Sequence, residues 1–259
     1  MSILGSLTPR TGLRVLVTAG AGGIGGRIVA GFVEAGAKVH ISDVDADAVT
    51  AATGGAVTGS VADAGDEAAS RRLFGEARDA MGGIDVVVAN AGIAGPTAAV
   101  AEISAEEWDQ TLDVNLRGAY LAARFGTPDL IANQGSFIAM SSVAGRLGFP
   151  YRTPYAAAKW GIVGLIKSLA GELGPQGVRA NAILPGIVEG PRIDRVISAR
   201  AKELDISFEE MKTRNLEKVS LRRMVSADDI AAACLFLCSP GGGNISGQAL
   251  SVCGNVEAL

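Results

Sequence analysis

Short apolar runs alternate with helical patterns along most of this chain, and this alternation restricts the range of folds more than any other feature. The runs are rich in β-branched residues and lie at residues 13–18, 38–43, 84–90, 136–141 and 178–185. Strands that alternate with helices build βαβ units, in which helices cover both faces of a parallel sheet. The sequence therefore predicts an α/β protein with a doubly wound parallel sheet.

Signals for the starts of helices agree with this pattern. Ser104 and Glu107 have the spacing of a capping box and predict a helix that begins there. Thr153 is expected to be the N-cap of another helix, with Pro154 in its first turn. Tyr155 is thereby placed at the beginning of that helix.

The rhythm of strands and helices breaks between residues 190 and 225, where Arg, Lys and Glu dominate. We interpret this stretch as a small inserted helical lobe, because no linker, repeat or low-complexity tract divides the chain. The prediction is one domain over residues 1–259 with a lobe at 190–225.

Charge, hydropathy and residue usage exclude several classes of protein. The formal net charge is −4 and no basic run occurs, which argues against nucleic acid or an anionic membrane as a partner. No apolar run is long enough to span a bilayer and the start lacks a secretory pattern, so we expect a soluble cytoplasmic protein. The only histidine, His40, lies in a strand pattern and the three cysteines lack metal-binding spacing, so no metal site is expected.

A glycine-rich string, TAGAGGIG at residues 18–25, lies where the first strand gives way to the first helix. Glycine lets the backbone approach a pyrophosphate closely, and the N-terminus of a helix favours its negative charge. Such a string also serves ordinary turns, so its position between strand and helix is the informative part. It predicts a dinucleotide site on a single Rossmann-type sheet.

Asp43 ends the second predicted strand, 18 residues after Gly25. A carboxylate there can accept hydrogen bonds from the adenosine ribose and would repel a 2′-phosphate, although a solvated surface aspartate is the alternative. Neither Gly22 nor Val44 offers a cation for such a phosphate. NAD is therefore the predicted cofactor, in preference to NADP.

Tyr155 and Lys159 are four residues apart and share one face of the predicted helix. An ammonium group beneath a phenol favours the phenolate, and such a tyrosine can exchange a proton with an alcohol or a carbonyl. Ser142 follows the strand at 136–141 and can offer its hydroxyl to the same substrate oxygen. A solvated Tyr–Lys pair is the alternative, and the rest of the chain must decide between them.

Seven elements stand in an order that resembles the short-chain dehydrogenase/reductase family, and the resemblance covers residue 14 to about residue 254. They are the glycine-rich loop at 18–25, Asp43, Asn90-Ala91-Gly92, Asn115, Ser142, Tyr155 with Lys159, and Pro185-Gly186.

The resemblance implies a role for each matching residue. Tyr155 would be the general acid or base, and Ser142 would hold the substrate oxygen. Lys159 would assist Tyr155 and bind the nicotinamide ribose, while Asn115 would distort its helix and hold a water that links Lys159 to solvent. The implied cofactor-binding residues are Thr18, Gly20, Gly23, Ile24, Gly25, Asp43, Ser60, Val61, Asn90, Ala91, Gly92, Tyr155, Lys159, Pro185, Gly186 and Val188.

Four positions depart from the family pattern. Ala19 replaces a usual glycine, which suggests that the tight turn is shifted by one residue. Ser60 stands where an aspartate commonly meets the adenine, and Cys253 replaces an aspartate near the C-terminus. Gly190 replaces a threonine that bonds the nicotinamide carboxamide, a role left to the Val188 backbone or to a water. None of these changes affects a residue with an implied role in proton transfer.

The leading hypothesis is an NAD-dependent oxidoreductase that interconverts a secondary alcohol and a ketone by hydride transfer. Sugars, polyols, hydroxy acids and cyclic alcohols would all fit. One alternative is a catalytically silent NAD(H)-binding sensor, which predicts the loss of a proton-transfer residue. Another is an epimerase or dehydratase on a related, longer scaffold.

The resemblance also implies that the lobe forms most of the substrate pocket and that the chain assembles as a homotetramer. The helices at residues 108–125 and 155–173 are the expected interface. Arginines of the lobe would bind a substrate anion, or else pair with neighbouring glutamates on a solvated face. These arginines are Arg192, Arg195, Arg200, Arg214, Arg222 and Arg223.

Overall fold

The computed structural model describes residues 2–256, apart from the side chains of Arg192, Ala199 and Glu203. Its centre is a seven-stranded sheet of order β3-β2-β1-β4-β5-β6-β7, in which every neighbouring pair is parallel. The predicted α/β, Rossmann-type fold is confirmed. The strands are β1 Arg14–Thr18, β2 Lys38–Asp43, β3 Val57–Val61, β4 Val86–Ala89, β5 Ser136–Met140, β6 Arg179–Pro185 and β7 Ala249–Val252.

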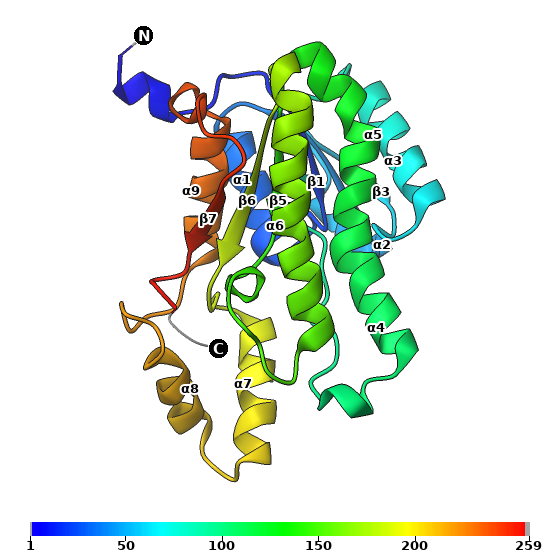
Figure 1. The fold of residues 1–259 in the computed structure, drawn as a ribbon. Coiled ribbons are helices and arrows are strands. Elements are labelled where there is room, and N and C mark those ends of the chain that lie inside the picture. The colour runs from blue at the N-terminus through cyan, green and yellow to red at the C-terminus, as the bar shows by residue number, and fades with distance from the viewer. Residues whose placement is uncertain (1, 257–259) are drawn as a thin grey trace.

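Helices cover both faces of this sheet (Figure 1). Residues of α1 and α9 pack on one face, and residues of α3, α5 and α6 pack on the other. The described α-helices are α1 Gly23–Glu34, α2 Ala46–Ala52, α3 Glu67–Met81, α4 Ala105–Leu112, α5 Gly118–Asn133, α6 Thr153–Leu173, α7 Pro191–Glu203, α8 Phe208–Leu216 and α9 Ala227–Cys238. Within residues 2–256, every helix is too short or too polar to cross a lipid bilayer.

The central strands are apolar on both sides because both sides are covered. In β1, Val15 and Val17 pack with the α1/α9 layer, whereas Leu16 between them packs with the α3/α5/α6 layer. All three side chains are fully buried. Each such side chain contributes about 1.5–3 kcal/mol of hydrophobic stabilisation, and this burial explains the continuous apolar runs in the sequence.

The two strands that the apolar runs did not predict, β3 and β7, lie at the edges of the sheet. Residues of both are partly exposed, and both carry polar residues such as Thr58 and Ser251. An edge strand buries less of its surface than a central one, so its sequence need not be apolar throughout.

The first strand, β1, lies inside the sheet, where it pairs with β2 on one side and with β4 on the other. Strands β2 and β3 extend the sheet in one direction, and β4 to β7 extend it in the other. The two halves therefore diverge between β1 and β4. In open α/β sheets a crevice forms at this point, beyond the carboxyl ends of the strands, and ligands bind there.

Helices α7 and α8 extend beyond the carboxyl ends of β6 and β7 (Figure 1). Their stem is a short parallel bridge between Val188 and Val225, in which the Val225 N–H donates to Ile187 O at 2.8 Å. The two helices enclose a small apolar cluster of their own, centred on Ile197 and Met211. That this stretch is a lobe of a single domain stays a prediction.

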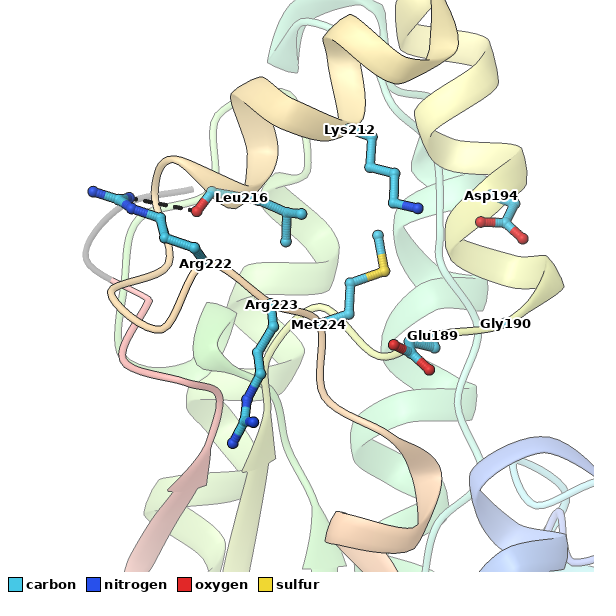
Figure 2. A pocket seen from close by; sticks show the side chains of 8 residues that line it. All are labelled: Glu189, Gly190, Asp194, Lys212, Leu216, Arg222, Arg223 and Met224. Carbon is cyan, nitrogen blue, oxygen red and sulfur yellow. Dashed lines mark hydrogen bonds between the residues drawn. The ribbon is translucent and has the colours of Figure 1, made fainter.

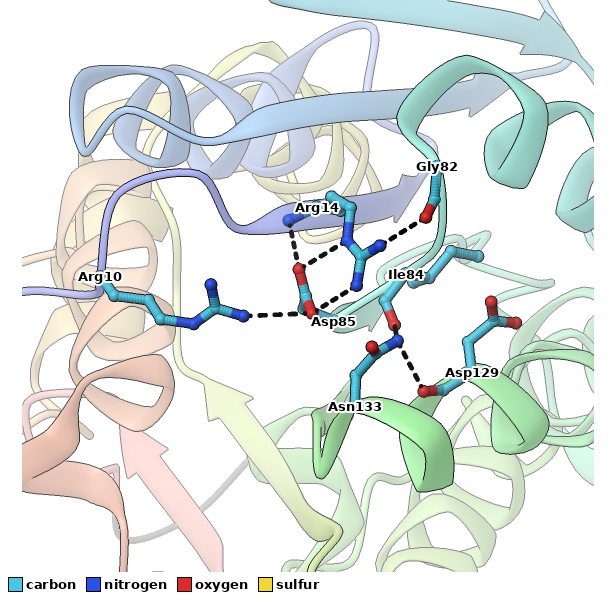
Figure 3. A network of polar contacts seen from close by, with 7 residues as sticks. All are labelled: Arg10, Arg14, Gly82, Ile84, Asp85, Asp129 and Asn133. Carbon is cyan, nitrogen blue, oxygen red and sulfur yellow. Dashed lines mark hydrogen bonds and ion pairs between the residues drawn. The ribbon is translucent and has the colours of Figure 1, made fainter.

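The opposite end of the sheet is held by an ion network (Figure 3). Arg14, the first residue of β1, donates from Nε and Nη2 to the two carboxylate oxygens of Asp85, each at 2.9 Å, and Arg10 approaches Asp85 Oδ1 at 3.2 Å. Burial alone would raise the pKa of Asp85, but the hydrogen bonds and charge of the arginines bring it below its ordinary value. The network joins the amino ends of β1 and β4.

Candidate active site

The helix predicted to begin near Tyr155 is α6, but its N-cap is not the predicted residue. Arg152 occupies the cap, and Thr153 is the first helical residue. The N–H of Arg152 closes a turn on Phe149 O at 3.2 Å, and its own carbonyl accepts the N–H of Ala156 at 2.9 Å. The chain is therefore already turning into the helix one residue before Thr153.

Lys159 lies beneath the ring of Tyr155, as their spacing predicts. Its Nζ is 5.5 Å from the ring centroid, and the residue is only 4% exposed. Nζ donates to Met140 O, at the end of β5, at 2.9 Å. The ammonium is therefore fixed between the end of a strand and the face of the phenol, which is not the arrangement of a solvated pair.

Ser142 lies on the segment between β5 and α6, where it caps the short 3-10 helix Val143–Gly145. Its Oγ accepts the N–H of Ala144 at 3.2 Å, so the hydroxyl proton remains available to donate to another group. This segment is pressed against α6, because a Cβ on Gly145 would lie only 2.6 Å from Lys159 O. The close packing brings the segment of Ser142 against the helix that carries Tyr155.

Asn115 lies at the centre of a π-helical turn, Asp113–Arg117, between α4 and α5. The expected distortion of this helix is present. Its Nδ2 donates to Thr111 O at 2.9 Å and to Ile93 O at 3.1 Å, while its buried Oδ1 has no hydrogen-bond partner among the described residues. A π-bulge inside a helix is frequently a functional feature.

Gly92 explains how Asn115 and Lys159 come to share one gap. A Cβ on Gly92 would lie 2.7 Å from Asn115 Oδ1 and 3.3 Å from Lys159 Nζ. Any larger residue would fill the space between the amide oxygen and the ammonium. Sequence reasoning did not identify Thr111 and Ile93 as supports of Asn115, because neither follows a motif.

The glycine-rich loop is fixed to the end of β4 by Thr18 and Asn90. Thr18 Oγ1 accepts the N–H groups of Asn90 and Ala91, each at 3.0 Å. Asn90 Nδ2 in turn donates to Thr18 O at 3.1 Å and to Ala19 O at 3.0 Å. The predicted cofactor residues Thr18, Asn90 and Ala91 thus lie together, and Gly92 follows Ala91 directly in the chain.

The glycine-rich loop begins at the alanine that departs from the family pattern. Ala19 itself adopts a left-handed conformation with φ 50°, in the place where the family has glycine. A Cβ on Gly25 would be 2.1 Å from Ala19 O, so the loop lies directly against α1. Gly20 crosses over β2, and its N–H donates to Ser42 O at 3.0 Å.

Helix α1 begins at Gly23, with Gly22 as its N-cap and no side chain that caps it. A Cβ on either glycine would meet nothing within 4 Å, so there is room beside the first turn of the helix. The N–H groups at the start of a helix have no partner within the helix itself. Ile24 packs partly buried behind them. This cradle fits a pyrophosphate.

Asp43 and Val61 are register partners at the ends of β2 and β3. Asp43 Oδ1 accepts the N–H of Val44 at 2.8 Å, and Val44 and Val61 expose their apolar side chains. Ser60 is buried instead. Its hydroxyl bonds Glu76 and lies 2.8 Å from His40 Nε2, so any contact of Ser60 with an adenine is left to its backbone.

The loop after β6 carries the last predicted cofactor residues. Gly186, after Pro185, lies so close to Cys253 that a Cβ would be 2.8 Å from its Cα. Val188 forms the stem of the lobe. Gly190 has φ 137°, which residues other than glycine rarely adopt, so the usual threonine does not fit this backbone.

A cavity of about 390 Å³ opens between α7, α8 and the returning loop (Figure 2). Figure 2 shows Lys212 directed into it and Arg223 directed out of it. Arg222 donates to backbone carbonyls of its own loop, and Arg214 pairs with Glu210 at 2.7 Å. Arg195 and Arg200 are exposed, whereas the side chain of Arg192 lies outside the described part.

These features bring most of the predicted site residues to the carboxyl ends of the strands, and comparisons with known proteins show the family to which the chain belongs. A family model described as enoyl-(acyl carrier protein) reductase matches residues 19–255. The chain is 36% identical to a probable galactose dehydrogenase of Rhizobium meliloti, over 93% of this chain and 94% of that one. It is 35% identical to the (2S)-[(R)-hydroxy(phenyl)methyl]succinyl-CoA dehydrogenase subunit BbsD of Thauera aromatica, over 92% and 94%.

Among solved structures, a 3-ketoacyl-(acyl-carrier-protein) reductase from Brucella melitensis, complexed with NADH, superposes with a TM-score of 0.84. It is 30% identical and the match covers 95% of this chain and 98% of that one. The chain belongs to the short-chain dehydrogenase/reductase family. It is an oxidoreductase of the kind that uses NAD(H) or NADP(H).

Proposed function

We propose that this protein interconverts a secondary alcohol and a ketone with NAD(H) as the preferred cofactor. The observation that carries the proposal is the buried ammonium of Lys159 beneath the ring of Tyr155. A nicotinamide bound at the crevice supplies or accepts the hydride, and the protein must then move one proton to or from the same substrate.

Tyr155 is the proposed proton donor in reduction and acceptor in oxidation, through its phenolic oxygen. Lys159 favours the phenolate and so eases the loss of that proton. Ser142 donates a hydrogen bond from its hydroxyl to the substrate oxygen and so orients it. Asn115 Oδ1, which faces the same gap as Lys159 Nζ, would accept a hydrogen bond from a water and complete a relay to solvent.

The remaining predicted residues are proposed to hold the cofactor. The first turn of α1 would bind the pyrophosphate, and Asp43 would accept hydrogen bonds from the adenosine ribose. The exposed apolar side chains of Val44 and Val61 flank this position and suit an adenine. A carboxylate at Asp43 would repel the 2′-phosphate of NADP, which is the basis for proposing NAD.

The site takes a secondary alcohol on a sugar, a polyol, a hydroxy acid or a cyclic compound. One relative is described as a probable galactose dehydrogenase and another as a dehydrogenase of a CoA ester. The names of similar proteins therefore include both a small and an extended substrate. A catalytically silent sensor would be expected to lack a proton-transfer residue. Asn115, Ser142, Tyr155 and Lys159 are all present.

We also propose a cytoplasmic homotetramer. Trp108 on α4, Tyr120 on α5 and Trp160 on α6 each expose more than a third of their surface. Large exposed apolar side chains on neighbouring helices suit a subunit interface. The mass in solution tests the assembly, and a monomeric mass would contradict it.

The decisive experiment is NAD⁺ reduction, followed by NADH absorbance, against a panel of sugars, polyols, hydroxy acids and cyclic alcohols. Tyr155→Phe keeps the ring but removes the transferable proton, so turnover should fall by about 10²–10⁴-fold with NADH still bound. Tyr120→Phe makes the same chemical change on α5 and should retain activity. Near-normal turnover in Tyr155→Phe would remove Tyr155 from its role.

Silence of the wild type across the panel, together with tight NADH binding, would favour the sensor instead. In that case Tyr155→Phe would leave NADH binding unchanged and no substrate would produce turnover.

A further inference from the structure

Arg152 is a buried arginine at the N-cap of a helix, a position where arginine is unfavourable. It is the N-cap of α6, only 7% exposed, and makes no side-chain capping bond. Short polar side chains stabilise this position, and a positive charge at a helix N-terminus opposes the helix dipole. Capping of the helix therefore does not explain an arginine at this position.

The guanidinium of Arg152 contacts two aromatic rings. Its Cζ is 5.1 Å from the centroid of Tyr155 and 5.2 Å from that of Phe149. The two rings are 6.3 Å apart and meet edge to face at 74°. Because Lys159 Nζ is 5.5 Å from the Tyr155 ring, the phenol is in contact with two cations.

Arg152 also joins Tyr155 to the segment that follows Gly92. Its Nη2 donates to Ala94 O, and close by the Ala98 N–H donates to Tyr151 O at 3.0 Å. Two links thus fix the chain just before α6 to residues 94–98. A guanidinium held in this way keeps the aromatic pair in one arrangement.

The groups that face Tyr155 come from several elements. Arg152 and Phe149 belong to the loop before α6, and Lys159 to α6 itself. Two further elements pack on α6: the 3-10 helix capped by Ser142 and the π-helical turn that contains Asn115, and both of these residues are neutral. Arg152 and Lys159 are the charged side chains with ring contacts to Tyr155 in the described part of the chain.

We propose that Arg152 is a positioning residue for proton transfer, which fixes the ring of Tyr155 and adds a second positive charge that favours its phenolate. This inference rests on the proposed role of Tyr155. A cation near an ionisable group favours the negative form of that group, and a fixed ring orientation keeps the phenolic oxygen aimed at one place. Arg152 need not touch the substrate to act in this way.

The first test is a spectrophotometric titration of Tyr155, which needs no substrate. The chain has three tyrosines, so the difference between the titrations with and without Tyr155→Phe isolates this one phenol. Arg152→Met removes the charge but keeps an apolar stem, and should move the ionisation midpoint upward. An unmoved midpoint in a folded Arg152→Met protein would overturn the proposal.

Arg71→Met is the matched control. Arg71 also stacks on an aromatic ring, 5.0 Å from the centroid of Phe125, but on α3. Its removal should leave the titration of Tyr155 unchanged. An equal shift in this variant would mean that the change in net charge alone moves the midpoint, which would contradict a specific role of Arg152.

The second test uses kinetics. In Arg152→Met the pH dependence of alcohol oxidation should shift upward together with the titration, and the loss of kcat should be recovered at high pH. A purely structural role would lower kcat equally at every pH. Arg152→Lys keeps the charge but not the planar contact, so its midpoint should stay near that of the wild type while kcat falls.

If Arg152→Met does not fold, Arg152→Lys tests the positioning role by itself. A kcat of Arg152→Lys equal to that of the wild type would overturn this role. The titration separates this inference from the proposed function. Absence of turnover in the wild type would refute the function, whereas an unmoved midpoint refutes only the inference.

Discussion

Asp43 and Ser60 lie close together at the ends of neighbouring strands, but their side chains have different surroundings. One oxygen of Asp43 accepts the Val44 N–H at the rim of the crevice, whereas the hydroxyl of Ser60 turns inward to His40 and Glu76. Burial lowers the pKa of His40, which favours a neutral ring in this network. The proposed selection of NAD(H) at this edge therefore rests on Asp43 and not on Ser60.

Asp43→Ala is expected to weaken the preference for NAD. The hydrogen bonds of a charged group contribute about 1.5–3 kcal/mol, so kcat/KM with NAD⁺ should fall about 10–100-fold. The value with NADP⁺ should fall less or rise, because a repulsive charge is removed. Steady-state kinetics with both cofactors measure the ratio, with Asp45→Ala as control, since Asp45 caps α2 and carries the same charge. An unchanged ratio would contradict the assignment of Asp43.

Single residues also mark what the sequence could and could not predict of the site. Tyr155 and Lys159 were predictable because helical spacing alone puts them on one face. The two ring contacts of Arg152 were not, since the position of its guanidinium depends on Phe149 and on a carbonyl nearly sixty residues earlier. Similarly, local propensity does not reveal the left-handed backbone of Ala19 or the close approach of its carbonyl to Gly25.

At the scale of elements, the junction between the glycine-rich loop and α1 cannot accommodate a side chain at Gly25. Gly25→Ala would place a methyl group 2.1 Å from Ala19 O and 2.7 Å from Asn90 Nδ2. We expect a loss of about 1–3 kcal/mol in the free energy of unfolding, because overpacking forces the backbone to shift. NADH binding should weaken by about tenfold or more, since the displaced loop forms the pyrophosphate cradle.

Gly75→Ala is the control for this element-scale prediction. Gly75 lies inside α3, where a Cβ would meet nothing within 4 Å. Alanine in an open helical position should stabilise the protein by about 0.5–1 kcal/mol. Thermal unfolding and NADH fluorescence titration measure both variants. Equal NADH affinity of Gly25→Ala and the wild type would contradict the tight junction.

The elements themselves were predictable in proportion to their burial. The five apolar runs correspond to β1, β2, β4, β5 and β6, none of which lies at an edge of the sheet. The edge strands β3 and β7 were missed because their residues are partly exposed and their sequences mixed. The capping box at Ser104 and Glu107 is present, because both of its hydrogen bonds are local. The N-cap of α6 differs by one residue, since tertiary contacts hold Arg152 in place.

For the whole molecule, the ion network around Asp85 predicts how stability depends on pH. The folded-state pKa of Asp85 lies below the unfolded value, so the contribution is complete above about pH 4 and is lost as pH falls through the folded-state pKa. Asp85→Asn should cost about 2 kcal/mol near neutral pH, because it leaves a partly buried Arg14 without its carboxylate. The variant should also lose less stability on acidification than the wild type.

Denaturant unfolding between acidic and neutral pH measures this effect. Asp228→Asn is the control, because Asp228 forms an exposed ion pair with Arg27 and should contribute less than about 1 kcal/mol. Parallel pH profiles for wild type and Asp85→Asn would contradict the assigned role of the network.

The position of β1 in the middle of the sheet has a consequence for how the chain folds as it is synthesised. β1 pairs early with β2, but its other edge waits for β4, more than sixty residues later in the chain. Until those residues emerge, the backbone N–H and C=O groups on the other edge of β1 are unpaired beside apolar side chains such as Val15 and Val17, and such edges recruit foreign strands. Parallel pairing over this separation is slow. The growing chain is therefore most prone to aggregation after β1–β3 have formed and before β4 closes the edge that later borders the cofactor crevice.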